Sequence, residues 1–299
     1  MENSKPQMTI LNHIKELRTR LLVSVVALFI TTTASFAFSQ YLAEFLAKPI
    51  GGLQAMSSID VTENVTAFMK ISLLAGVILA LPIIVSQVLA FIVPGLNPNE
   101  RPWIWIMIPL ATLFFFGGVA FAYFFMLPTA LPFLMNFMGI TTSPRPSTYF
   151  GFVTNLMFWV GVSFELPLVM YVLARLHIVS AKQLLKQWRI AILASAILAA
   201  FITPTVDPVN MGLMTLPLFA LYLLSIIFAV IARRERKEKV KKRLSKRKWI
   251  LLLVTFAIIL AAISTAVLVW PEEVDLVLSS TSQFFVKLWE SISRLLTKT

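Results

Sequence analysis

Long stretches without charged residues alternate with short charged segments along this chain of 299 residues. Several of these stretches hold the roughly 20 apolar residues that a helix needs to cross a hydrocarbon core of about 30 Å. Only helices and closed barrels satisfy their backbone hydrogen bonds in lipid, and the stretches lack the alternation typical of barrel strands. The pattern predicts seven membrane-spanning helices, near residues 21–40, 71–93, 103–127, 150–174, 189–203, 211–231 and 249–270.

Two features modify this set of spans. The span at 189–203 would be only about 22 Å long at roughly 1.5 Å per residue, so it either lies behind longer neighbours or thins the bilayer beside it. Proline removes a backbone donor and bends a helix, and several bent helices would give the bundle a concave face. The prolines in or at the ends of spans are Pro82, Pro109, Pro128, Pro132, Pro167 and Pro217.

The composition agrees with a membrane protein. Apolar residues make up 58% of the chain and charged residues 13%, about half of the roughly 25% that is usual for soluble domains. This balance excludes a water-soluble monomer. The first apolar stretch is longer than the about 7–15 residues of a signal-peptide core, so we predict an uncleaved span. The chain has no cysteine, which excludes disulfides, thiol nucleophiles and Cys-bound metal.

The net charge of +12 is distributed unevenly between the two predicted faces of the membrane. Segments at 1–20, 94–102, 175–189 and 232–248 fall on one side and hold 20 of the 26 Lys and Arg residues. By the positive-inside rule this side is cytoplasmic, which places the N-terminus inside and, after seven spans, the C-terminus outside. The basic run at 233–248 connects two spans, so we interpret it as a topology anchor on anionic lipid and not as a nucleic-acid site.

Two acidic residues, Glu16 and Glu100, stand out on the basic side. Each has a local explanation. Glu16 can pair with Arg20 one helical turn away, and Glu100 can serve as the acid of a helix capping box. Two carboxylates at the mouth of a basic face would also suit a guanidinium ligand, since the fork of arginine matches a carboxylate. From the residues alone, both interpretations stay open.

Glu165 is the only ionisable residue inside a predicted span. A charge at mid-membrane costs at least ~2.5–3.5 kcal/mol, so this carboxyl should face a wet groove, or be neutral and bonded to a neighbouring helix. His13 and His177 have no metal-ligand spacing around them, and the sequence contains no H-E-x-x-H motif, Walker loop, G-x-S-x-G motif or intramembrane aspartate pair. We therefore expect no metal, no cofactor and no catalytic activity. Apolar residues at helical spacing between 285 and 296 predict an amphipathic surface helix.

Five motifs, in order across residues 10–231, resemble the TatC family, the multispanning core of the twin-arginine protein translocase. Any one of them alone would be weak, but their shared order makes the resemblance specific. The motifs are HIKELRTRL (13–21), QVLAFIVPGL (87–96), FAYF (121–124), GVSFELP (161–167) and ITPTVDP (202–208).

The resemblance implies an all-α polytopic membrane protein, with a six-helix TatC-like bundle over 1–232 that has a concave face and its N-terminus inside. It implies a translocase subunit of the cytoplasmic membrane that recognises twin-arginine signal peptides of precursor proteins. Folded cargo would cross with TatA- and TatB-type single-span partners, driven by the proton-motive force, and the subunit would self-associate in a receptor complex. The residues carried over are Glu16, Arg18, Phe91, Pro94, Leu96 and Glu100 for signal-peptide binding, Glu165 for the intramembrane groove, and Pro49 and Asp207 for the extracytoplasmic caps.

Parts of the chain depart from the six-span pattern of the family. A basic cytoplasmic linker (233–248), an additional seventh transmembrane helix (249–270) and an extracytoplasmic tail (271–299) follow the bundle. Met211 stands where the family often has Gln, and Leu223 stands where it often has an acid. Both lie on the last shared helix, which lowers the expectation of polar partner contacts there.

The alternative function that the residues allow is a proton-coupled small-solute transporter that uses Glu165 as its relay. Transporters usually show repeated halves and several polar groups at mid-membrane depth. The sequence contains neither feature, so it disfavours this alternative.

Overall fold

The computed structural model describes residues 10–93, 104–135, 143–176, 178–202 and 208–238, and all regular secondary structure within these ranges is helical. Short 3-10 helices are η1 and η2, and η5 is a π-helical turn. The elements are α1 (Ile10–Phe36), α2 (Ser39–Ala47), η1 (Lys48–Ile50), η2 (Leu53–Ala55), α3 (Val61–Ile92), α4 (Ile104–Phe121), η5 (Ala122–Met126), α5 (Leu127–Met135), α6 (Pro146–Phe164), α7 (Leu166–Arg175), α8 (Ala181–Lys186), α9 (Trp188–Ile202) and α10 (Pro208–Glu238).

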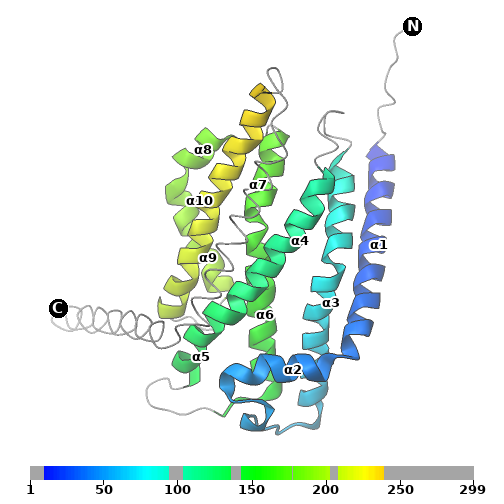
Figure 1. Ribbon diagram of the computed structural model, residues 1–299, viewed down its shortest axis with the longest axis vertical. Coiled ribbons are helices and arrows are strands. Elements are labelled where there is room, and N and C mark those ends of the chain that lie inside the picture. Colours follow the sequence, from blue (N-terminus) through cyan, green and yellow to red (C-terminus); the bar gives the residue numbers. More distant parts are fainter. Residues whose placement is uncertain (1–9, 94–103, 136–142, 177, 203–207, 239–299) are drawn as a thin grey trace, which may run out of the picture.

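Six of the seven predicted spans coincide with apolar helices (Figure 1). Among the described residues, five helical stretches are long and apolar enough to cross a membrane. A further apolar helix, α9, has only 15 residues, about 22 Å at roughly 1.5 Å per residue. The short span predicted at 189–203 is thereby confirmed as a short apolar helix. The predicted seventh helix at 249–270 and the tail at 271–299 lie outside the described residues. Helix α10 continues through 233–238, the beginning of the predicted linker.

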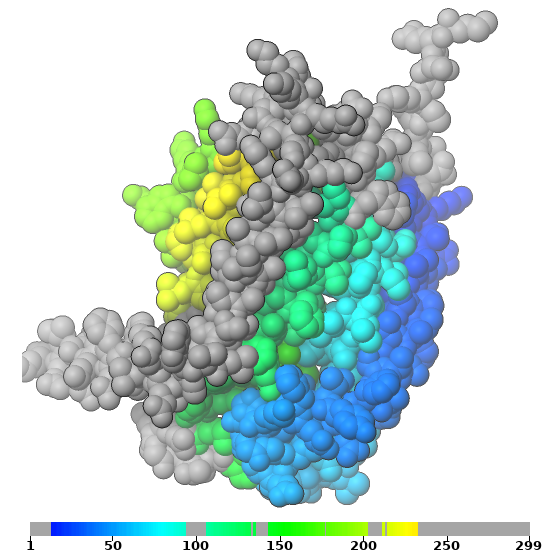
Figure 2. Space-filling view, in the orientation of Figure 1, coloured from blue at the N-terminus to red at the C-terminus, as the bar shows by residue number. Residues whose placement is uncertain are grey.

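In Figure 1 the helices lie side by side, from α1 at one edge of the molecule to α8, α9 and α10 at the other. Helix α1 packs on α3, α3 packs on α4 and α6, and α10 packs on α7 and α9. In Figure 2, α1 and α3 run along one edge of the molecule, and α2 closes one end of it. Helix α1 packs mainly on α3, and many of its other apolar side chains, such as Phe29, are exposed as expected for a helix facing lipid.

Helix α4 connects the two buried clusters of the bundle. Phe114 belongs to a cluster formed by α4, α7, α8 and α10, whereas its neighbour Phe115 belongs to a larger cluster with α2, α3 and α6. Both rings are only 1% exposed. Because successive helical residues point about 100° apart, two adjacent phenylalanines can serve different clusters. The tilt of α4 across the bundle in Figure 1 places it between them.

Two glycines let α4 and α6 approach closely. A Cβ atom on Gly118 of α4 would lie 2.8 Å from the Cα of Gly161 on α6, and a Cβ on Gly161 would lie 2.9 Å from the Phe115 ring. Small residues allow helix backbones to approach in membranes, where packing replaces the hydrophobic effect as the source of association. These glycines therefore hold the centre of the bundle together.

Proline accounts for the two breaks in the long spans. The predicted span at 150–174 is divided into α6 and α7 at Glu165, two residues before Pro167. Since Pro167 has no N–H, the backbone tightens there, and the Glu165 N–H donates to the Val162 carbonyl at 3.0 Å. In the span formed by α4 and α5, the π-helical turn η5 ends just before Pro128. A π-helical turn of this kind commonly bends a helix.

Candidate functional site

The chain crosses the bundle repeatedly, so its polar segments gather at two ends. We call the end where α1 begins and α8 lies the α8 end, and the opposite end, closed by α2, the α2 end (Figure 1). The α8 end carries the basic residues Lys15, Arg18 and Arg20 of α1 and those of α8 and of the start of α9. The described helices thus place these basic segments on one side, as predicted from the charge pattern.

Glu16 lies on α1 at the α8 end and pairs with Arg20 one turn later. Arg20 donates to Glu16 Oε1 through Nε at 3.0 Å and through Nη2 at 2.5 Å. The second oxygen, Glu16 Oε2, is buried and has no hydrogen-bond partner among the described residues, and it lies 3.9 Å from His13 Nδ1. The structure contains the local pair that the sequence allowed, and no described donor binds the second oxygen of the carboxylate.

His13 connects this carboxylate to α3. Its ring stacks on Phe91 with centroids 4.4 Å apart and planes 27° from parallel. Phe91 lies near the end of α3 and is half-buried, whereas Arg18 points to the exposed side of α1. The structure therefore links Glu16 and Phe91, two residues that are 75 positions apart in the chain, through His13.

The lack of metal-ligand spacing gave no reason to predict a role for His13. In the structure its ring stacks on Phe91, and its Nδ1 lies 3.9 Å from Glu16 Oε2. The spacing from His13 to Glu16 on one helix could have indicated a contact with the carboxylate, since residues three apart share a helix face. Three of the predicted signal-peptide contacts, Pro94, Leu96 and Glu100, lie outside the described residues.

Glu165 lies at the junction of α6 and α7, within the apolar part of the bundle. Its Oε1 atom is buried and has no hydrogen-bond partner within the described ranges. Its backbone carbonyl accepts from the Leu168 and Val169 N–H groups at 3.0 and 2.9 Å and so begins α7. A buried carboxyl oxygen without a donor in an apolar bundle is costly unless the group is protonated or meets a ligand.

The predicted cap residue Pro49 is exposed in η1 at the α2 end, and Asp207 lies outside the described residues. Two buried tyrosines anchor this cap to the bundle. The Tyr123 hydroxyl donates to the Phe45 carbonyl and the Tyr149 hydroxyl donates to the Leu46 carbonyl, both at 2.8 Å. On α10, Met211 is half-buried and Leu223 is exposed.

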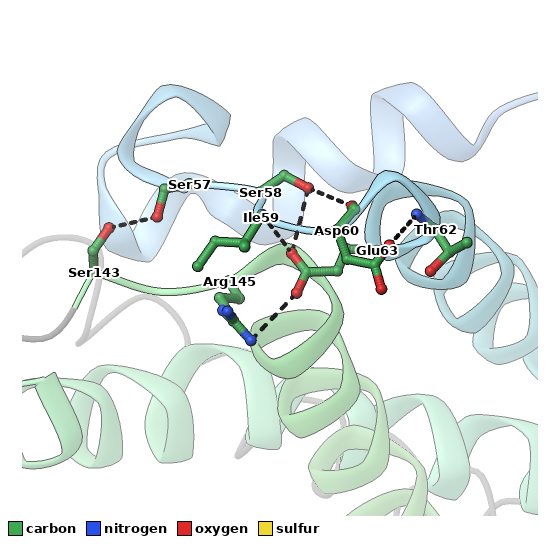
Figure 3. Close-up of polar contacts among 8 residues, drawn as sticks. All are labelled: Ser57, Ser58, Ile59, Asp60, Thr62, Glu63, Ser143 and Arg145. Atoms are coloured by element: carbon green, nitrogen blue, oxygen red, sulfur yellow. Dashed lines mark hydrogen bonds and ion pairs between the residues drawn. The ribbon is translucent and has the colours of Figure 1, made fainter.

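A polar network closes the loop between η2 and α3 at the α2 end (Figure 3). Glu63 is 8% exposed, and its Oε2 accepts from the Ile59 N–H at 3.2 Å and from the Ser58 hydroxyl at 3.3 Å. Its Oε1 lies 3.6 Å from Arg145 Nη1. Asp60 caps α3 by accepting from the Thr62 N–H at 3.2 Å. The network ties α3 to the start of α6.

Lys70 lies inside helix α3, which is longer than the predicted span. The sequence placed Lys70 just before the span at 71–93, but α3 begins at Val61, so Lys70 is the tenth residue of the helix. Its Nζ donates to the Ser147 carbonyl at 3.1 Å. Helix α3 is longer than the predicted span because the Asp60 cap starts it before the apolar residues begin.

Comparison with known proteins assigns the chain to one family. A family model described as Sec-independent protein translocase protein (TatC) matches residues 12–217. The chain belongs to the TatC family. The TatC protein of Deinococcus radiodurans is 39% identical over 240 residues, which cover 76% of this chain and 88% of that protein. The chloroplastic TatC of Arabidopsis thaliana is 36% identical over 221 residues, which cover 73% of this chain and 65% of that protein.

A crystal structure described as the twin arginine translocase receptor TatC superimposes with a TM-score of 0.65 at 33% identity, covering 74% of this chain and 99% of that one. As a member of the TatC family, this chain is a multi-pass membrane protein and a subunit of a protein translocase. The family match contains Glu16, Phe91 and Glu165. It gives no support to the solute-transporter alternative.

Proposed function

We propose that this chain is the subunit of the cytoplasmic membrane that receives the paired arginines of a twin-arginine signal peptide, and that Glu16 and Glu100 hold them. The observation that carries the proposal is the half-satisfied carboxylate of Glu16. One oxygen pairs with Arg20, and the other is buried without a donor among the residues that the structure describes. A buried acceptor without a partner costs about 1–3 kcal/mol, which an incoming guanidinium would recover.

The α8 end would be the cytoplasmic face. The surplus of basic residues at the α8 end follows the positive-inside rule. Among so many basic residues, an acidic residue such as Glu16 is unusual. Arginine is a better ligand for such an acid than lysine because its planar fork can donate two parallel hydrogen bonds to one carboxylate. Arg18, Phe91, Pro94 and Leu96 would shape the site around the acid.

After capture, the apolar part of the signal peptide would insert along the concave face toward Glu165, and Pro49 and Asp207 would belong to the caps on the far side. TatA- and TatB-type single-span proteins would then join, with self-association of this chain in a receptor complex. The proton-motive force would drive passage of folded cargo. We assign no catalytic step, metal or cofactor to the chain, and the lipid membrane is its only other predicted partner.

Capture of a precursor by the full-length protein tests this function. A precursor with a twin-arginine signal should retain the detergent-solubilised protein, and the same precursor with a twin-lysine signal should retain much less. Glu16→Gln should lower capture of the first precursor toward the level of the second. Glu44→Gln is a matched control because Glu44 is an exposed acid on α2, at the other end of the bundle. Equal capture of both precursors by the wild-type protein would contradict the proposal.

The orientation has its own test. With the α8 end in the cytoplasm and a seventh crossing at 249–270, a tag after residue 299 should be cleaved by protease added outside intact cells. A tag that is protected until the membrane is opened would show that residues 249–270 do not cross. That result would change the topology without affecting the site at Glu16.

A further inference from the structure

The α2 end carries an apolar groove that the proposed function does not use. Its volume is about 980 Å³, and it opens between α3, α5 and α6, with one contact from α1. Most of the lining is aliphatic or aromatic, including Leu74, Val77 and Phe158. Two basic side chains, Lys70 and Arg145, also line it. Glu165 is not among the lining residues.

The basic groups stand together near the start of α6. Lys70 Nζ binds the carbonyl of Ser147, the second residue of that helix, and Arg145 is its N-cap. Gly151 makes room for the lysine, because a Cβ there would lie 2.7 Å from Nζ. Lys70 lies about 13 Å along α3 from its first residue, at roughly 1.5 Å per residue, so its head extends back toward the membrane boundary.

The two charges are not neutralised to the same extent. Arg145 pairs with Glu63 through one nitrogen at 3.6 Å, and its side chain is still 46% exposed. No described carboxylate lies within 4.0 Å of Lys70 Nζ. The described hydrogen bond of Lys70 Nζ goes to the neutral Ser147 carbonyl. Within the described part of the chain, the groove therefore combines an apolar lining with a positive charge that no carboxylate neutralises, which matches a molecule with an anionic head and an apolar tail.

The charges of the groove favour a phospholipid over an apolar transmembrane helix. An anionic phospholipid supplies a phosphate for the two basic side chains and an acyl chain for the apolar lining. An apolar spanning helix would supply no anionic group to either positive charge. Lysine and arginine both bind phosphate, lysine as a point charge and arginine through its fork.

We propose that this groove binds an anionic phospholipid, with its phosphate at Lys70 and Arg145 and an acyl chain along the face that contains Val77. The lipid would belong to the leaflet at the α2 end. The inference does not depend on the proposed function, because the groove and the site at Glu16 lie at opposite ends of the bundle. A bound lipid would complete the surface between α3 and α6 where no described side chain fills it.

Lipid retention measured by native mass spectrometry tests the proposal. The full-length protein is exchanged into detergent with equal amounts of phosphatidylglycerol and phosphatidylcholine, and the retained lipids are counted. Wild type should retain phosphatidylglycerol preferentially. Lys70→Gln should lower that retention about fivefold, the effect of losing about one basic contact near a lipid surface. Lys70→Arg should restore it. Lys48→Gln is the control, because Lys48 is an exposed lysine of η1 outside the groove.

A second variant separates a lipid from a free phosphate. Val77 lies seven positions after Lys70, on the same face of α3, so Val77→Trp fills the apolar part of the groove and keeps both charges. It should also reduce phosphatidylglycerol retention. If only Lys70→Gln has an effect, and inorganic phosphate displaces the retained lipid, the site binds an anion and not a lipid. If neither variant changes retention while both stay monodisperse, the proposal is wrong, and an acidic side chain of a partner helix becomes the better counter-charge for Lys70.

Discussion

Arg20 should act as an internal competitor for the arginines of the signal peptide. It donates twice to Glu16 Oε1, and the two side chains are 26% and 20% exposed. A signal arginine that binds Glu16 must share or replace this contact. Removing the competitor in Arg20→Gln should therefore increase the affinity for the signal peptide, whereas removing the acceptor in Glu16→Gln should decrease it. If the contact between Arg20 and Glu16 only stabilised α1, the two variants would change the affinity for the signal peptide in the same direction.

The magnitude follows from the exposure of the pair. An exposed i,i+4 ion pair is worth about 0.3–0.5 kcal/mol, and a charge-assisted hydrogen bond about 1.5–3 kcal/mol. Because the pair of Arg20 and Glu16 is about one quarter exposed and screened by salt, we expect its interaction free energy to be about 1 kcal/mol. At about 1.4 kcal/mol per tenfold change, Arg20→Gln should tighten binding about fivefold. A competitor affects every ligand equally, so the preference for twin arginine over twin lysine should not change.

Fluorescence anisotropy of a labelled signal peptide, titrated with the full-length protein in detergent, measures both quantities. Lys15→Gln is the matched control, since it removes one positive charge from the exposed face of the same helix segment and has no described contact with Glu16. This variant reports the gain that arises from lower charge alone. Weaker binding in Arg20→Gln than in Lys15→Gln would refute the competition and indicate that Arg20 positions the carboxylate for the ligand.

Two further predictions concern the packing that supports the sites. Gly118→Val should destabilise the bundle by about 1–3 kcal/mol, because its side chain would collide with the backbone of α6, whereas Gly212→Ala, with no atom within 4 Å of the new Cβ, should not. Tyr149→Phe should cost about 1–3 kcal/mol by leaving the buried Leu46 carbonyl without its donor, whereas Tyr41→Phe, 74% exposed, should change stability by less than about 0.5 kcal/mol. Thermal unfolding in detergent, followed by loss of the monodisperse peak, measures both; equal losses in variant and control would contradict them.

Hydrophobic patterning predicted the six described spans because helices in lipid must be both apolar and long. It could not predict where those helices begin and end. Helix α3 starts ten residues before its predicted apolar segment, since the Asp60 cap and the Glu63 network extend it into the polar loop. For the same reason Lys70 was assigned to the boundary and not to the groove. Its partner, Ser147, is 77 positions away, and no local pattern indicates such a contact.

The candidate site was predictable in part. Charge counting alone made Glu16 conspicuous, and helical spacing predicted its contact with Arg20, which the structure contains. The contact between His13 and Phe91 required the packing of α1 on α3, which periodicity does not specify. The length of the apolar segment did not predict that the fourth span is divided at Glu165, although Pro167 is the local cause of the division.

The central claim is that the arginine pair of a signal peptide is received beside Glu16, at the α8 end. The most direct measurement is to place a photoreactive amino acid next to the arginine pair, crosslink it to the full-length protein in membranes, and map the crosslinked residues by mass spectrometry. We expect crosslinks to the start of α1 around Glu16 and to the end of α3 around Phe91, and their loss in a Glu16→Gln, Glu100→Gln double variant. Crosslinks confined to the α2 end, or unchanged in the double variant, would contradict the central claim.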